Sequence, residues 1–161
     1  MNETHLAYLN LGSNIQPETN LLKAVELLSG CGEILQVSNV WESEPVGTEG
    51  PNYLNACLLF KSTFNQTELK TKVVHLVESQ LGRKRTGDKF APRPMDIDIV
   101  LFDNISTDNA FWNLAYVVVP LADICPNCKN PLTEETVYET ATRLRREVWL
   151  ETRPEVLSQF R

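Results

Sequence analysis

The apolar and polar positions of the first hundred residues predict strands and helices in succession. The apolar segment 6–11 predicts a strand, and the Gly-Ser-Asn sequence at 12–14 ends it with residues that favour turns. Pro17 suits the first turn of a helix, and apolar residues follow it at helical spacing. We expect Gly30 or Gly32 to end that helix.

Two further strands are predicted over 34–41 and 53–60. The loop over 44–51 between them is rich in Gly and Pro. A second helix is expected to begin near Asn65, because Glu68 stands three residues later as the partner in a capping box.

The second helix is expected to end at Gly82, and the segment 95–102 predicts a fourth strand. The order strand, helix, strand, strand, helix, strand is typical of the split βαβ sandwich of ferredoxin-like α+β folds. The apolar run 115–119 predicts an added strand, and a C-terminal helix is expected from 133 to about 149. No repeat or long linker divides the chain, so we expect a single domain over 1–161.

Composition and charge exclude several classes of protein. The net charge of −6 argues against general nucleic-acid binding, which needs a basic surface. Apolar runs are far too short for a membrane span, and the polar first residues lack a signal peptide, so we expect a cytoplasmic protein. The four cysteines do not indicate a disulfide framework in a chain of this size.

One basic segment interrupts this acidic background. Five of the fifteen Lys and Arg residues lie between Arg83 and Arg93, opposed only by Asp88. A charge run is usually a solvated loop. Arginine side chains can also bind phosphate oxygens in a bidentate manner, so the segment is a candidate site for a discrete anion.

Two carboxylates follow this basic segment directly. Asp96 and Asp98 alternate with Ile97 on the predicted fourth strand, so both carboxylates point to one side. Neighbouring carboxylates repel each other unless a cation lies between them, and Mg²⁺ commonly takes one or two carboxylates. An exposed pair on an edge strand is the alternative, but the adjacent arginines favour a magnesium and phosphate site.

Other motifs are less specific. Tyr53 and Asn55 share a strand face and could bind a flat heterocycle, or simply lie at the rim of the core. Cys125 and Cys128 have the spacing of a zinc half-site, but no second pair completes it, so we interpret them as loop cysteines able to form a fortuitous disulfide. No GxxxxGK[ST] segment occurs, which excludes an ordinary P-loop.

Several of these segments together resemble a known family. They are Tyr8-Leu9-Asn10-Leu11-Gly12-Ser13-Asn14, Glu44-Pro45-Val46-Gly47, Tyr53-Leu54-Asn55, Gly82-Arg83, and Phe90-Ala91-Pro92-Arg93-Pro94-Met95-Asp96-Ile97-Asp98-Ile99. In order and spacing they are similar to the 6-hydroxymethyl-7,8-dihydropterin pyrophosphokinases (HPPK) of folate biosynthesis, over about residues 6–102. The resemblance implies a ferredoxin-like α+β fold and transfer of pyrophosphate from ATP to the pterin hydroxymethyl group, with release of AMP.

The resemblance also implies roles for individual residues. ATP and a small pterin are the expected partners, with two Mg²⁺ ions as cofactor and a monomer or weak dimer as the assembly. The implied catalytic residues are Arg83 and Arg93, and the implied metal ligands are Asp96 and Asp98. The implied pterin-binding residues are Ser43, Val46, Tyr53, Asn55 and Tyr116, and the implied nucleotide-binding residues are His75, Glu78, Arg85 and Phe90.

The segment after the fourth strand departs from the family pattern. The usual Pro-His-Pro is absent from 106–113, and Leu114 stands where an arginine is expected, although Pro120-Leu121 is kept. Three hypotheses therefore stay open: an active HPPK, a paralogue that binds pterin or nucleotide with impaired catalysis, and a pyrophosphokinase acting on a related heterocyclic alcohol.

Overall fold

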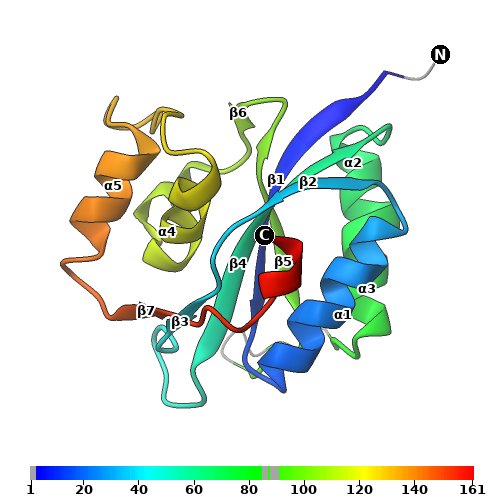
Figure 1. The fold of residues 1–161 in the computed structure, drawn as a ribbon, viewed down its shortest axis with the longest axis horizontal. Coiled ribbons are helices and arrows are strands. Elements are labelled where there is room, and N and C mark those ends of the chain that lie inside the picture. Colours follow the sequence, from blue (N-terminus) through cyan, green and yellow to red (C-terminus); the bar gives the residue numbers. More distant parts are fainter. Residues whose placement is uncertain (1–2, 85–86, 88–90) are drawn as a thin grey trace.

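One antiparallel sheet organises the fold. The computed structural model describes residues 3–84, 87 and 91–161. Seven strands pair in the order β6-β5-β1-β4-β3-β7, and β2 also pairs with β4 (Figure 1). The strands are β1 (His5–Ser13), β2 (Glu33–Val37), β3 (Trp41–Ser43), β4 (Tyr53–Ser62), β5 (Asp96–Phe102), β6 (Ile105–Ser106) and β7 (Leu150–Thr152).

Helices cover both faces of this sheet. One face carries α1 (Pro17–Ser29) and a continuous helical run made of α2 (Gln66–Glu68), the π-helical η1 (Leu69–Val74) and α3 (His75–Gln80). The opposite side carries α4 (Ala115–Ile124) and α5 (Val137–Leu144), as Figure 1 shows. Short 3₁₀ turns, η2 (Asn109–Asn113) and η3 (Ser158–Phe160), complete the described elements.

The caps expected from the sequence are present. Pro17 opens α1 and Gly30 is its C-cap. Asn65 accepts a hydrogen bond from the Glu68 N–H, and the Glu68 carboxylate accepts one from the Asn65 N–H, which is the predicted capping box. The split βαβ order predicted for residues 6–102 is therefore confirmed.

The side chains of β1 alternate between two different environments, one on each face of the sheet. Leu9 and Leu11 are fully buried in a core that also contains Leu21, Val25 and Val77 of the helices on that face.

On the other face of β1, Asn10 and Gly12 line a cavity. A second core, formed by α4 and α5 with Trp41, Cys57 and Leu101, covers this face only in part. The uncovered part carries the candidate site.

The predicted strand over 115–119 is wrong, because this segment begins α4. Its Val-Val-Val run has high β-propensity, but a short apolar run does not by itself distinguish a strand from a buried helix. Val117, Val118 and Val119 are all buried in the second core, so packing decides for the helix.

Two other boundaries differ from expectation. The predicted strand over 34–41 is divided into β2 and β3, and between them the Ser38 hydroxyl accepts the Cys57 N–H at 2.8 Å. The predicted C-terminal helix is shorter and spans only α5. Strand β7, which pairs with β3, was not predicted at this position. None of the helices in the described ranges is long and apolar enough to cross a membrane.

Candidate active site

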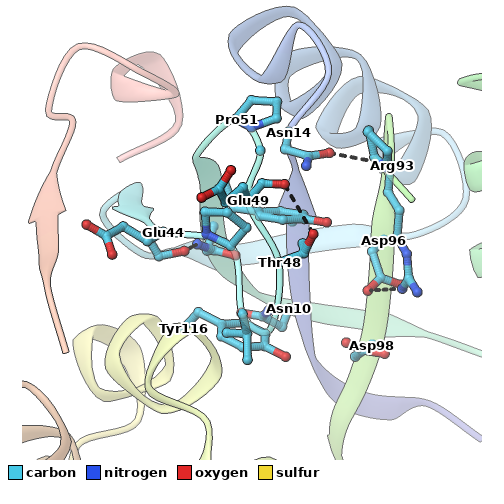
Figure 2. Close-up of a pocket in the computed structure, with 18 residues that line it drawn as sticks. Asn10, Asn14, Glu44, Thr48, Glu49, Pro51, Arg93, Asp96, Asp98 and Tyr116 are labelled. Atoms are coloured by element: carbon cyan, nitrogen blue, oxygen red, sulfur yellow. Dashed lines mark hydrogen bonds and ion pairs between the residues drawn. The ribbon is translucent and has the colours of Figure 1, made fainter. Parts of the chain in front are cut away.

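A cavity of 370 Å³ opens on the uncovered part of the sheet, between β1, β4, β5, the loop after β3 and the first turn of α4 (Figure 2). Eight of the residues predicted for the site line it. They are Ser43, Val46, Tyr53, Asn55, Arg93, Asp96, Asp98 and Tyr116.

Strand register explains why residues far apart in the chain meet here. Gly12 lies opposite Asn55 of β4 on one side and opposite Asp96 of β5 on the other. Asn10 lies in the same way between Cys57 and Asp98. Directly opposed residues of antiparallel strands share a face, so these two rows form the floor of the cavity.

The Asn55 amide is held so that its oxygen faces the cavity. Its nitrogen donates to the Ser43 hydroxyl at 2.8 Å and to the Trp41 carbonyl at 3.3 Å. Its oxygen lies above Gly12, 3.1 Å from the position that a Cβ would take there. The glycine therefore leaves room beside an oriented hydrogen-bond acceptor, which suits the N–H edge of a flat ring.

Two tyrosines line the same cavity from different elements. Tyr53 begins β4, and Tyr116 lies in the first turn of α4. Burial is the first cause that raises the pKa of each phenol above its ordinary value, and Asp98 adds to the effect at Tyr116. Both rings are therefore neutral at physiological pH and available for stacking.

A chain of ion pairs leads from the cavity into the protein: Arg93 and Asp96 line the cavity, while Arg83 and Glu78 are not among its lining residues. The Arg83 guanidinium donates to the buried Glu78 carboxylate and to Asp96 Oδ1 at 2.8 Å. Arg93 donates to Asp96 Oδ2 at 3.1 Å (Figure 2). Burial lowers the pKa of Arg83, but Asp96 and Glu78 outweigh it and raise that pKa overall. Asp96 thus orients both arginines toward one point.

Asp98 is in a different electrostatic environment. Burial, then the negative charges of Asp96 and Glu78, raise the pKa of its carboxyl to about 7. The positive charges of Arg83 and Arg93 offset this rise only in part, so a further cation beside Asp98 would favour its charged form.

Asp96 and Asp98 lie on the same face of β5 and both line the cavity, which fits a Mg²⁺ site completed by substrate oxygens and water. Within the described residues no group of three or more His, Cys, Asp or Glu side chains could hold a metal.

Asn14 is a site residue that the sequence indicated only as part of a turn. Its side-chain oxygen accepts the Arg93 N–H at 2.7 Å, and its own N–H donates to the Arg93 carbonyl at 3.1 Å. This two-point clamp fixes the backbone of Arg93 against the end of β1 (Figure 2).

The predicted nucleotide-binding residues lie in several places. Arg85 and Phe90 lie outside the described residues. His75 begins α3 and is not among the residues that line the cavity. Glu78 is 3% exposed, and besides Arg83 it accepts the Ile97 N–H at 2.9 Å, so it connects α3 to β5. The nucleotide role of these four residues stays a prediction.

Replacing Glu78 by alanine should lower the free energy of unfolding by about 3 to 5 kcal/mol, because it leaves the Arg83 charge and the Ile97 N–H without this partner. Glu78→Gln keeps an acceptor and should cost less. Urea denaturation measures both, with the exposed Glu26→Ala on α1 as control. If Glu78→Ala and the control lost the same free energy of unfolding, Glu78 would not stabilise the contact between α3, Arg83 and β5.

Cys125 and Cys128 form a disulfide with their Cα atoms 5.7 Å apart. They follow α4 and are not among the residues that line the cavity. This agrees with the interpretation as loop cysteines.

Comparison with known proteins identifies the family. The family model of 7,8-dihydro-6-hydroxymethylpterin-pyrophosphokinase (HPPK) matches residues 8–126. The chain belongs to the HPPK family. The matched range contains both rows of the cavity floor, the ion-pair chain and Tyr116.

Curated relatives agree with this assignment. The chain is 33% identical over 152 residues to the 2-amino-4-hydroxy-6-hydroxymethyldihydropteridine pyrophosphokinase of Bacillus subtilis, covering 87% of this chain and 90% of that protein. It is 34% identical over 142 residues to the protein of the same name from Aquifex aeolicus, covering 82% and 88%.

Solved structures confirm the fold. The wild-type Plasmodium falciparum HPPK-DHPS crystallised with pteroate matches with a TM-score of 0.69 at 13% identity, covering 91% of this chain and 43% of that one. The same protein with pterin and p-hydroxybenzoate gives a TM-score of 0.68. This chain therefore spans less than half of those HPPK-DHPS chains.

Proposed function

We propose that this chain transfers the pyrophosphoryl group of ATP to the hydroxymethyl group of 6-hydroxymethyl-7,8-dihydropterin and releases AMP, a reaction of folate biosynthesis. The observation that carries the proposal is the arrangement of the cavity: an oriented amide and two tyrosines line it together with a carboxylate pair and Arg93, and Arg83 is bonded to that pair through Asp96. The names of the HPPK relatives support the same reaction.

The acceptor half of the cavity suits a pterin. The Asn55 oxygen would accept hydrogen bonds from the N–H groups of the ring, and Tyr53 and Tyr116 would stack on it. Ser43 and Val46 line the same half, and the Ser43 hydroxyl holds the Asn55 amide in position.

The donor half suits a magnesium-bound triphosphate. Asp96 and Asp98 would hold two Mg²⁺ ions, which when bound supply charge neutralisation along the phosphate chain. The Arg83 and Arg93 guanidinium groups would donate to oxygens of the transferring group. His75, Glu78, Arg85 and Phe90 are proposed to contribute on the nucleotide side.

The reaction needs positioning more than covalent chemistry by the protein. The pterin hydroxyl oxygen forms a bond to the β-phosphorus of ATP, the bond between that phosphorus and the α-phosphate oxygen breaks, and AMP leaves with the electron pair while the hydroxyl proton is released. The two halves of the cavity bring acceptor and donor together, and the arginines stabilise the charge that spreads over the transferring oxygens.

Leu114 is the observation that favours a second candidate. Leu114 stands where the family pattern has an arginine. It is the N-cap of α4, and with Trp149 it lines a hollow of 510 Å³ that adjoins the cavity and shares Tyr116 with it. A chain without that cation could bind ligands with impaired turnover, or could take a related heterocyclic alcohol.

The test is formation of AMP from ATP and the dihydropterin in the presence of Mg²⁺, followed by chromatography of quenched samples. We expect one AMP per pterin pyrophosphate formed. Calorimetric binding of both ligands without AMP would instead support the impaired paralogue, and AMP formed only with another hydroxymethyl heterocycle would support the changed substrate.

We further propose a cytosolic protein that folds as a single domain and is a monomer or weak dimer. Strand β7, near the C-terminus, pairs with β3 of the N-terminal half, which supports the single domain. Sedimentation analysis over a concentration series tests the assembly.

A further inference from the structure

Asn10 of β1 carries a buried polar side chain. It is 3% exposed, and its amide oxygen is shielded from solvent and has no hydrogen-bond partner among the described residues. Buried polar groups are nearly always paired, because an unpaired one loses its hydration without compensation. The burial of the Asn10 oxygen without a partner therefore needs a physical explanation.

The location of Asn10 points to a ligand. It lines the cavity from the central strand β1, opposite Asp98 of β5 and Cys57 of β4. Adjacent strands lie about 4.8 Å apart, so the backbone that carries this amide runs next to that of the carboxylate pair. Figure 2 shows Asn10 on the cavity floor between Tyr116 and Asp98.

The sheet rows indicate which part of a ligand would lie over this amide. The row of Asn55, Gly12 and Asp96 is followed, two residues along β1, by the row of Asn10 and Asp98. If Asn55 holds the pyrimidine edge of the acceptor, the acceptor alcohol must reach toward the carboxylates to meet the phosphate. The arm that carries the alcohol then passes above Asn10.

We propose that Asn10 is a specificity-determining residue whose amide hydrogen-bonds the hydroxymethyl oxygen of the acceptor. This inference rests on the proposed function. An amide presents both an acceptor and donors, so Oδ1 can accept the alcohol O–H and orient the oxygen lone pair toward the donor phosphate. Such a site rejects analogues that lack the hydroxyl, because they leave the amide unpaired.

The experiment compares the binding of two ligands in variants of Asn10 and in a control variant of another buried asparagine, Asn130. Binding of 6-hydroxymethylpterin and of 6-methylpterin is measured by pterin fluorescence, with Mg²⁺ and α,β-methylene-ATP, in which the bond that must break is replaced. Asn10→Ala should weaken the hydroxymethyl ligand about tenfold and the methyl ligand less than about twofold. Asn10→Ser, which keeps a small polar group, should lie between the wild type and Asn10→Ala.

Asn130→Ala is the matched control. Asn130 is 1% exposed, but its amide donates to the Thr140 hydroxyl at 3.2 Å and accepts the Leu132 N–H at 2.8 Å, far from the cavity in the chain. We expect Asn130→Ala to lower the thermal midpoint and leave pterin affinity unchanged. Asn10→Ala should leave the midpoint unchanged or raise it, because it removes a buried amide oxygen that has no partner among the described residues.

Two results would overturn the inference. One is that Asn10→Ala loses the same affinity for both ligands. The other is that the thermal midpoint of Asn10→Ala falls as much as that of Asn130→Ala while its selectivity between the two ligands is unchanged. A wild-type chain that binds neither pterin would instead count against the proposed function, so the two failures are distinguishable.

Discussion

Arg93→Ala should lower the rate of AMP release by about a thousandfold, because an arginine on the transferring phosphoryl group is worth that order of magnitude. The Arg93 guanidinium lines the cavity and lies 3.1 Å from Asp96 Oδ2, so its removal takes away a charge at the point where the phosphates are expected. Quenched-flow measurement of AMP gives the rate.

The same substitution should leave pterin affinity nearly unchanged. The two hydrogen bonds that hold this segment to Asn14 use the backbone of Arg93 and survive truncation of its side chain. Arg146→Ala is the matched control, since Arg146 is exposed and is not among the residues that line the cavity. A rate for Arg93→Ala equal to that of the control would refute the role assigned to Arg93.

Asp98→Asn should have opposite effects on stability and activity. The folded protein holds the pKa of Asp98 at about 7, above the ordinary value of 3.8. Between these values the folded state binds a proton that the unfolded state does not, so stability falls as the pH rises from about 4 to about 7. In the absence of Mg²⁺ the asparagine variant should gain about 2 to 4 kcal/mol at pH 8 and nothing near pH 4.

Activity should be lost in the same variant, because an amide cannot supply the charge that the metal needs. Urea unfolding at the two pH values and the AMP assay measure the two effects. Asp103→Asn is the control of opposite sign: the hydrogen bonds from His5 and the Leu6 N–H lower the pKa of Asp103, so this variant should gain no stability at pH 8. Full magnesium-dependent activity in Asp98→Asn would exclude a metal role.

Local signals in the sequence predicted the elements that depend on local chemistry. Pro17, Gly30 and the Asn65 capping box act within a few residues, and the predicted helix boundaries there are confirmed. Alternation along β5 likewise predicted that Asp96 and Asp98 share a face, which the cavity confirms.

Features that depend on contacts between distant segments were not predictable in this way. The Val117–Val119 run forms a helix because it packs in the second core, which its own sequence does not reveal. The burial of Glu78 against Arg83 and Ile97, and the unpaired amide of Asn10, follow from how α3 and β1 lie against β5. The family resemblance marked Glu78 and the segment around Asn10, but it did not indicate that either side chain is buried.

The order of the paired strands along the chain determines the order in which the parts of the cavity are synthesised. The part of the floor on β1 is synthesised first, β4 begins about forty residues after β1 ends, and the carboxylates of β5 follow later still. Tyr116 follows with α4. Pairing between segments so far apart in the chain is slow, so a nascent chain whose β5 is still inside the ribosome lacks the carboxylates and Tyr116 of the cavity.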